Sequence, residues 1–556
     1  MNHKKMSPFW AWNCIALFLS LSTSFAQQKL PMIKAGSTAV TIKDGYIIRE
    51  GIWNISPDVK PDIYQAIASS AQKTVSFYTD IDSIAFRVSP GNTYSFNILL
   101  HNKDTCLTQI STPGLPLKTA GLAPTKAGNT ALPLSPELLA MDFVVFRNAL
   151  LAEHGGLYRY QPEQTLNHLM DSCLLSIDQP MTALEFGKKI LFITSKIRDG
   201  HTGTNISGLL VNNYLENTRL FPLTLYFTGH RAFVRCSKLE AFPTGTEMLS
   251  INGEKINVIT GQLCNYLPSD GSISTKKYQT LNNGAFPVLY KWIYDHGDSL
   301  SVSYKNLQGK ILTTRIAAQL ASDFECAQQQ TGSGTKDLDL SYPQPNTALL
   351  TIKTFDEQRL ARNQLNFSAY LKQVFSELSD RKTGNLIIDL RGNAGGQDSY
   401  GPLLYSYLTD KAFTYFAAIQ TADRKLNATE NSFMKPQQPQ ANPFKGKLLI
   451  LINGLSFSAS ADFCALIKSA GRAKFIGEET GGGYYGNTSG QTTKLELPNT
   501  KIKVIIPKYS YFNAVKKAKY PDRGTIPDYP VVPNVFQLRQ NKDVQLEVAL
   551  GLAGEK

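Results

Sequence analysis

Residues 448–460 read LLILINGLSFSAS, and this stretch decides the fold. An apolar run ends in a glycine turn and a cluster of serines. Apolar side chains then recur at helical spacing, at positions 459, 463, 466, 467 and 470. The stretch predicts a buried strand, a sharp turn and a helix that begins at Ser458.

Ser458 has two interpretations. Serine is a common capping residue, and on this stretch alone capping is the simpler explanation. The same position also exposes a hydroxyl at the end of a buried strand, beside backbone N–H groups that can stabilise negative charge. Ser458 is therefore a candidate nucleophile.

The composition is that of a large globular protein. The chain has 556 residues, 42% hydrophobic and 18% charged, which suggests several domains. The net charge of +13 comes without a dense Lys/Arg block interleaved with aromatics, so nucleic-acid binding is not predicted. The cysteines are scattered without C-x-x-C spacing, so we expect no zinc site, no other metal and no cofactor. The sequence does not predict the oligomeric state.

Residues 1–26 are typical of a secretory signal peptide. Lys4 and Lys5 precede an apolar core at 15–21, and small residues at 24–26 suit cleavage. The core is too short to span a bilayer, and no later stretch is long and apolar enough to do so. We therefore expect an exported protein without a transmembrane segment, periplasmic or extracellular in a bacterium.

The rest of the chain divides into parts of different pattern. The expected parts are a β-sandwich at 27–112, a Pro/Gly-rich linker at 113–136, a helical subdomain at 137–215, a second strand-rich domain at 216–325 and an α/β core at 338–556. An Asn-Gly turn at 252–253 marks a hairpin in the second strand-rich domain. A long polar loop at 424–446 is expected within the core.

Further segments bear on Ser458. Residues 391–396, RGNAGG, follow a predicted strand, and their glycines can turn backbone N–H groups toward a ligand. A phosphate loop is disfavoured because no G-K-[ST] follows. The glycine-rich segment at 477–483 permits close backbone approach. A plain tight turn remains the alternative for such glycines.

A serine nucleophile needs a base, and histidine is the usual one. His201 lies at a glycine break after a predicted helix, and His154 is the competing candidate. Asp522 and Asp528 are candidate carboxylates that could orient the base, although each could equally be a turn residue.

Three motifs in order resemble the tail-specific (C-terminal-processing) serine peptidases. They are LIIDLRGNAGG at 386–396, LILINGLSFSAS at 449–460 and FIGEETGGG at 475–483. The resemblance implies a multidomain α+β protein with a PDZ-like domain at 216–325 and a crotonase-like (ClpP/crotonase) peptidase core. It also implies hydrolysis of polypeptide substrates by Ser458. The oxyanion would be held by the N–H groups of Ala459 and Gly395, with Gly396 as the alternative to Gly395.

The family has two catalytic branches. One carries a lysine in the turn after G-E-x-T, where this chain has Gly482, Gly483 and Tyr484. The other branch, similar to the tricorn core protease, uses a histidine from the helical segment, and His201 fits that position. The resemblance then places an acid near Asp522, one position out of register, with Asp199 or Asp528 as alternatives.

Two other functions stay open. The chain could be a catalytically inactive peptide- or ligand-binding protein on the same fold, since a fold hosts many functions. It could also act through its N-terminal β-sandwich as a glycan-binding or adhesion protein. For the peptidase, we expect substrate recruitment by strand addition to the PDZ-like domain.

Overall fold

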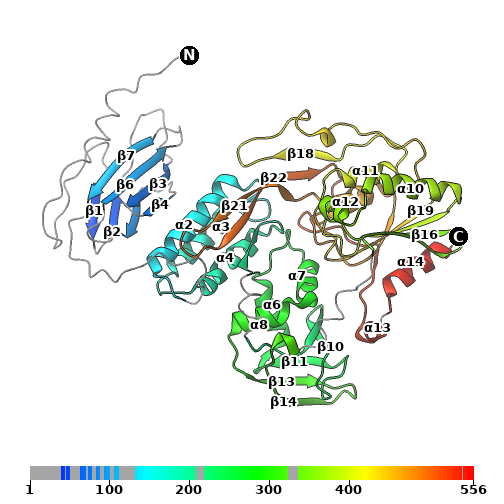
Figure 1. Ribbon diagram of the computed structural model, residues 1–556, viewed down its shortest axis with the longest axis horizontal. Coiled ribbons are helices and arrows are strands. Elements are labelled where there is room, and N and C mark those ends of the chain that lie inside the picture. Colours follow the sequence, from blue (N-terminus) through cyan, green and yellow to red (C-terminus); the bar gives the residue numbers. More distant parts are fainter. Residues whose placement is uncertain are drawn as a thin grey trace. The chain divides into compact units, whose positions relative to one another are not determined.

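The computed structural model describes residues 132–206, 208, 218–323, 336–540 and 542–555, with the backbone of seven strands between 39 and 111 (Figure 1). The chain divides into two units. The larger comprises residues 151–170, 187–495 and 502–556, and it carries every candidate site residue. The predicted signal peptide and residues 113–131 of the predicted linker lie outside the described residues.

The N-terminal strands form two antiparallel sheets. One has the order β1 (Ala39–Lys43), β2 (Tyr46–Glu50), β5 (Ser83–Arg87), and the other β4 (Lys73–Phe77), β3 (Ile63–Ser70), β6 (Thr93–Leu100), β7 (Thr105–Ser111). The alternating pattern of this region thus coincides with strands. Its packing as a β-sandwich stays a prediction.

Helices follow where the apolar periodicity predicts them. They are α2 (Pro136–Glu153), α3 (Glu163–Leu175) and α4 (Ala183–Ile197), and the short strand β8 (Gly203–Thr204) comes next. Helix α2 buries one face, which includes Leu139, Phe143, Phe146 and Leu150. No helix of the described residues has the length and apolarity needed to cross a membrane.

The region expected to be PDZ-like contains one antiparallel sheet with helices. Its strand order is β14 (Ile311–Ala317), β13 (Ser299–Lys305), β11 (Glu247–Ile251), β10 (Arg231–Cys236), β9 (Thr224–Thr228), with β12 (Glu254–Lys255) paired to β11. The helices are α6 (Ile256–Cys264), α7 (Thr275–Thr280), the π-helix η3 (Leu281–Ala285) and α8 (Phe286–Tyr294), and the 3₁₀ turn η4 (Ala321–Asp323) follows β14. The Asn-Gly turn is confirmed, because Asn252 and Gly253 both have positive φ.

The edge strand β9 is closed by the chain itself. Asn282 in η3 accepts from the Phe227 N–H at 2.6 Å and donates to the Phe227 carbonyl at 3.1 Å. The Phe286 ring packs on Phe221 and on Phe227, with centroids 5.6 and 4.9 Å away. The side-chain amide therefore pairs with β9 as a neighbouring strand would.

The C-terminal part is built on a six-stranded mixed sheet. Its order is β15 (Leu338–Gln344), β16 (Thr347–Ile352), β17 (Asn385–Asp389), β19 (Lys447–Ile452), β20 (Lys474–Gly477), β23 (Tyr529–Pro530), parallel from β16 onward. A second sheet has the order β18 (Phe416–Gln420), β22 (Lys503–Asn513), β21 (Thr488–Glu496). The other elements are α9 (Glu357–Arg362), α10 (Phe367–Asp380), α11 (Tyr400–Ser406), η6 (Ser432–Met434), α12 (Ala459–Ala470), α13 (Val535–Arg539) and α14 (Val544–Gly554).

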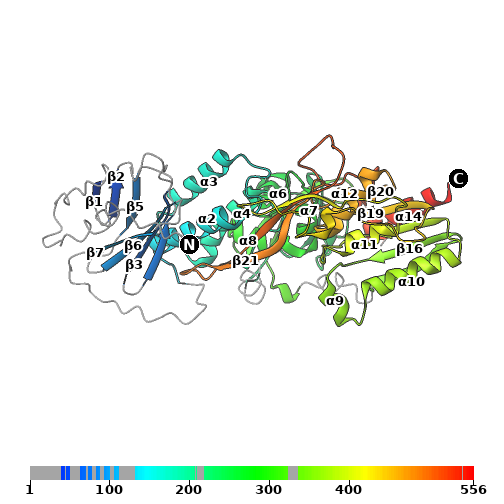
Figure 2. The ribbon, with the colours of Figure 1, turned by 90° about the horizontal axis from the view of Figure 1, so that it is seen from above.

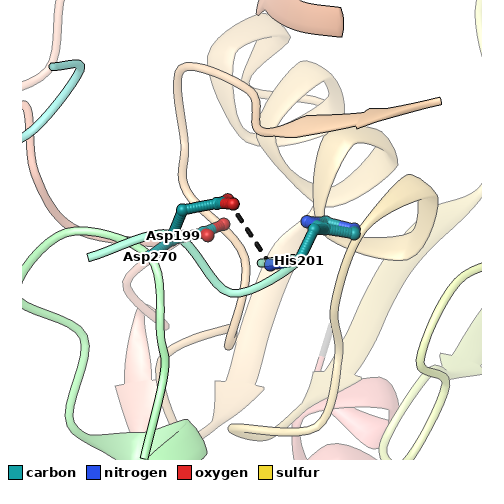
Figure 3. Close-up of side chains that lie close together, drawn as sticks. All are labelled: Asp199, His201 and Asp270. Carbon is teal, nitrogen blue, oxygen red and sulfur yellow. Dashed lines mark hydrogen bonds between the residues drawn. The ribbon is translucent and has the colours of Figure 1, made fainter. Parts of the chain in front are cut away.

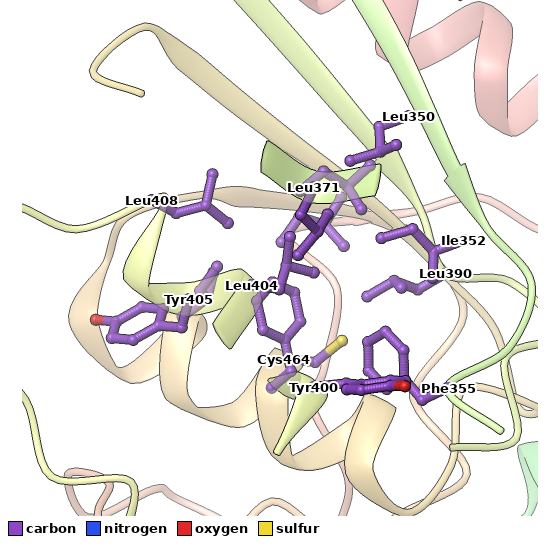
Figure 4. Packing of buried hydrophobic residues seen from close by; sticks show 14 of the residues in the cluster. Leu350, Ile352, Phe355, Leu371, Leu390, Tyr400, Leu404, Tyr405, Leu408 and Cys464 are labelled. Carbon is purple, nitrogen blue, oxygen red and sulfur yellow. The ribbon is translucent and has the colours of Figure 1, made fainter. Parts of the chain in front are cut away.

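The continuous apolar run of β19 is explained by burial on both faces of the sheet. Leu448, Ile450 and Ile452 belong to the large core formed with α10, α11 and α12 (Figure 4). Leu449 and Leu451 belong to a smaller core formed with α14. Both views show α10 and α14 on opposite sides of the strands (Figure 1, Figure 2). A parallel strand with two covered faces needs apolar residues throughout.

Candidate active site

The turn between β19 and α12 is locked to the glycine loop that follows β17. Asn453 accepts from the N–H of Gly392 at 3.0 Å and from the N–H of Leu455 at 3.1 Å. Ser456 donates to the Leu390 carbonyl at 2.8 Å. These bonds satisfy the buried polar groups of the turn and fix the residue that follows it, Ser458.

Ser458 does not cap α12 with its side chain. Its backbone has φ 54° and ψ −133°, and its hydroxyl makes no capping hydrogen bond. A side-chain-bearing residue at such positive φ is strained by about 1–3 kcal/mol, and strain of this kind clusters at functional sites. The capping interpretation is therefore wrong for this serine, and the turn presents its hydroxyl outside the helix.

The glycine loop lies directly against Ser458. A Cβ on Gly395 would come within 2.6 Å of the Ser458 Cβ, and one on Gly396 within 2.1 Å of the Phe355 carbonyl carbon. The Gly395 N–H donates to the Asn393 side chain at 2.9 Å. Within the part of the chain that the structure describes, the N–H groups of Gly396 and Ala459 have no acceptor. Ala459 and Gly396 are therefore two N–H groups of this turn and loop that a ligand could bind.

His201 comes to this turn from the segment after α4. Its ring stacks on that of Phe457, with centroids 4.4 Å apart and an interplanar angle of 27°. Both ring nitrogens are buried and have no hydrogen-bond partner among the described residues. Burial lowers the pKa of His201 to about 4, and the Asp199 carboxylate only partly offsets this. The imidazole is thus neutral at neutral pH and able to accept a proton.

Asp199 lies beside the His201 loop, and a hydrogen bond joins the two (Figure 3). Its carboxylate accepts from the N–H of His201 at 3.4 Å and from the N–H of Thr202 at 2.9 Å. Burial opposes its charge, but the hydrogen bonds that its carboxylate accepts from His154 and Thr202 help to lower the pKa of Asp199 to about 2. A fixed negative charge therefore lies beside the loop that carries His201.

Asp270 and Lys276 are two further buried ionisable residues near Asp199 and His201. Asp270 accepts from the N–H of Gly200 at 2.7 Å and from the N–H of Gly483 at 3.0 Å. Burial, with the charge of Asp199, raises the pKa of Asp270 to about 6. Burial lowers the pKa of Lys276 to about 8, against the two carboxylates. No sequence motif indicated either residue.

The competing histidine is fully engaged. His154 Nδ1 accepts from the Gly156 N–H at 3.1 Å. Its Nε2 therefore carries the proton and lies 2.8 Å from the Thr202 hydroxyl and 3.3 Å from Asp199. With both nitrogens bonded, His154 is a structural support for Asp199.

The other predicted carboxylates lie in different surroundings. Asp522 accepts from Arg198 at 3.2 Å and from the Ser272 hydroxyl, and its side chain is 40% exposed. Asp528 accepts from the Phe475 N–H at 2.8 Å and pairs with Lys468 at 2.9 Å. Within the described residues neither contacts His201, whereas Asp199 does.

Asp199, His201 and Asp270 each offer an atom that could ligate a metal, and these atoms lie within 4.8 Å of one another (Figure 3). The carboxylates already accept backbone N–H groups, and the Lys276 ammonium supplies positive charge nearby. We therefore assign no metal here. Of the described cysteines, Cys264 and Cys464 carry free thiols and Cys236 is disulfide-bonded.

Part of the chain is similar to known peptidases. Residues 346–531 match the model of Peptidase family S41. A chloroplastic C-terminal processing peptidase of Tetradesmus obliquus is 27% identical over 178 residues, covering 32% of this chain and 35% of that protein. A protein of Staphylococcus epidermidis named "Probable CtpA-like serine protease" is 26% identical over 196 residues, covering 33% of this chain and 36% of its own length. Over about a third of its length the chain is therefore similar to the serine-type peptidases of the S41, or tail-specific, family.

A solved structure extends the likeness of fold. Mature CPAF superimposes with a TM-score of 0.52 at 13% identity, covering 75% of this chain and 96% of that one. At this identity the likeness concerns the fold alone. The match to the two sequence relatives spans about a third of their lengths.

Proposed function

We propose that this chain is an exported serine endopeptidase in which Ser458 is the nucleophile and His201 the general base. The observation that carries the proposal is the strained Ser458, which lies against the glycine loop at Gly395, together with His201, which stacks on the neighbouring Phe457 and whose ring nitrogens have no hydrogen-bond partner among the described residues. Those features match what acyl transfer requires: a nucleophile, a base and an oxyanion site.

The proposed reaction follows from these positions. His201 takes the proton of the Ser458 hydroxyl as its oxygen attacks the peptide carbonyl carbon. The N–H groups of Ala459 and Gly396 receive the oxyanion, and each such donor is worth about 3–4 kcal/mol in the transition state. His201 then returns the proton to the leaving amine, and water hydrolyses the acyl-enzyme with the same base.

Asp199 is the proposed orienting acid instead of Asp522. Its carboxylate holds the backbone on both sides of the histidine ring, through the N–H groups of His201 and Thr202. Its negative charge also stabilises the imidazolium that forms during attack. This assignment keeps the serine–histidine interpretation and replaces only its third member.

The proposed substrates are unfolded proteins or protein C-terminal tails. An extended peptide adding to the PDZ-like sheet would pair with β9, where Asn282 already holds Phe227. Binding at this edge therefore requires Asn282 to move. We expect Asn282→Ala to increase the affinity for an extended peptide, measured by fluorescence anisotropy. Asn283→Ala, at the exposed neighbouring position, is the control. Equal affinities in both variants would exclude β9 as the docking edge.

Hydrolysis of an unfolded protein tests the central proposal. Ser458→Ala is expected to abolish cleavage of reduced casein, whereas Ser460→Ala should stay within about threefold of wild type. Ser460 is a matched control because its hydroxyl is buried two residues away and has no hydrogen-bond partner in the described part of the chain. Cleavage by Ser458→Ala at the wild-type rate would contradict the assignment of Ser458 as the nucleophile. A folded wild-type protein that cleaves no substrate would favour the alternative of a catalytically inactive binding protein.

A further inference from the structure

Helix α7 of the PDZ-like segment is fixed onto the turn that leads to Ser458. The Thr275 hydroxyl donates to the Glu479 carbonyl at 3.0 Å, and Gln279 donates to the Glu478 carboxyl at 2.5 Å. Gly454 approaches so closely that a Cβ there would lie 2.4 Å from the Thr275 carbonyl carbon. The backbone of α7 is therefore positioned against the nucleophile turn, and Lys276 is its second residue.

The Lys276 ammonium joins the two halves of the candidate site. It donates to the Gly200 carbonyl at 3.0 Å and lies 3.3 Å from the centroid of the Phe457 ring. Gly200 directly precedes His201, and Phe457 directly precedes Ser458. A Cβ on Gly200 would meet the Lys276 nitrogen at 2.7 Å and the Phe457 ring at 2.8 Å. Because Gly200 has no side chain, the Lys276 ammonium can occupy this space.

We infer that Lys276 is a positioning residue of this site: its ammonium group holds the histidine loop at Gly200 against the nucleophile turn at Phe457. The inference rests on the proposed function and adds a residue to it. Both contacts use the protonated amine, since a carbonyl oxygen and a ring face attract positive charge. Lys276 therefore acts as a cation and not as the base.

The charge of Lys276 also acts on His201. The titratable groups that interact with the ammonium are Asp199, Asp270 and His201; Tyr160 adjoins the two carboxylates, and His154 bonds to Asp199. Lys276 lowers the pKa of His201, whereas Asp199 raises it. A cation held here consequently favours the neutral imidazole that proton acceptance requires.

The test compares Lys276→Met, which removes the charge, with Lys276→Arg, which keeps it. Lys276→Gln keeps an N–H donor without the charge and serves if Lys276→Met does not fold. Lys277→Met is the matched control, because the Lys277 ammonium donates to the Cys264 carbonyl instead. The readouts are the pKa of His201, by NMR of protein with ¹³C-labelled histidine, and the pH profile of labelling by a fluorophosphonate.

We expect Lys276→Met or Lys276→Gln to raise the pKa of His201 by about one unit. Because the histidine loop is then no longer held at Gly200, labelling at neutral pH should also slow at least about tenfold. In Lys276→Arg the pKa of His201 and the labelling rate should both stay close to those of the wild type. Lys277→Met should change neither the pKa of His201 nor the labelling rate. An unchanged His201 pKa in Lys276→Met would overturn the inference. So would loss of labelling at every pH in Lys276→Met with normal labelling of His201→Ala, because Lys276 would then be the base.

The two proposals fail in different ways. A folded wild type that never labels contradicts the proposed function, yet the NMR titration still decides whether Lys276 acts on His201. Normal labelling with an unchanged His201 pKa in every Lys276 variant overturns only the inference about Lys276.

Discussion

Two histidine segments of this molecule both form hydrogen bonds with the carboxylate of Asp199, but they differ in the hydrogen bonding of their ring nitrogens. His154 accepts at Nδ1 from Gly156 and donates at Nε2 toward Thr202 and Asp199. His201 has no hydrogen-bond partner at either nitrogen within the described residues, and it stacks on Phe457, which directly precedes the candidate nucleophile. A buried histidine whose ring nitrogens are both hydrogen-bonded stabilises the fold. A buried histidine whose ring nitrogens are unbonded costs folding free energy, but those nitrogens are available for proton transfer.

The largest expected effect separates these two histidines. His201→Ala should slow fluorophosphonate labelling about 10³-fold, the typical contribution of a general base, and leave the protein folded because no hydrogen bond is lost. His154→Ala should instead lower the free energy of unfolding by about 1–3 kcal/mol, since it leaves buried polar groups unpaired. Labelling rates and urea unfolding measure both. Slow labelling in His154→Ala together with normal labelling in His201→Ala would contradict the comparison.

The next effect concerns the shared carboxylate. Asp199→Asn removes the charge beside His201, and we expect labelling to slow about 10²-fold. Asp522→Asn should stay within about threefold, because Asp522 contacts Arg198 and Ser272 at a partly exposed position. Stopped-flow or gel-based labelling rates distinguish the two. A larger loss in Asp522→Asn would return the orienting role to the acid that the sequence suggested.

The pH dependence sharpens the contrast with an ordinary histidine. Because burial lowers the pKa of His201 to about 4, its neutral form persists well below the usual value of 6.5. The labelling rate should therefore fall about tenfold per unit only below about pH 4. Loss of the Lys276 charge, with a pKa of about 8, should reduce the rate again at alkaline pH. An acid limb near pH 6.5 would show that His201 is solvated like an ordinary histidine.

The smallest expected effect tests the space beside the histidine loop. Gly200→Ala should slow labelling roughly tenfold, because its methyl group would displace the Lys276 ammonium and the Phe457 ring. Gly203→Ala is a matched control in the same loop, since its Cβ would meet only the His201 carbonyl, at 3.9 Å. Equal rates in the two variants would show that the packing at Gly200 has no influence on His201.

The parts of the fold that the sequence predicts are those set by local pattern. The run at 448–452 is apolar throughout because both of its faces are buried, and the glycine and serines after it mark the turn. The glycine loop at 391–396 and the Asn-Gly hairpin follow from the same kind of local rule. These elements also carry the family likeness.

The parts that the sequence could not predict depend on contacts between distant segments. Lys276 carries no motif, and its role depends on α7 reaching both Gly200 and Phe457. The proposal of Gly396 in place of Gly395 as oxyanion donor depends on Asn393, which accepts from the Gly395 N–H. His154 and His201 each adjoin glycine, so only their partners in space distinguish them.

The most direct test of the account is to locate the adduct formed by a fluorophosphonate on the wild-type protein. After proteolysis, mass spectrometry should place the phosphonyl group on Ser458 alone, with no adduct on Ser456, whose hydroxyl donates to Leu390, or on buried Ser460. The same experiment on His201→Ala should give little adduct in the same time. An adduct on another serine, or full labelling of Ser458 without His201, would contradict the account.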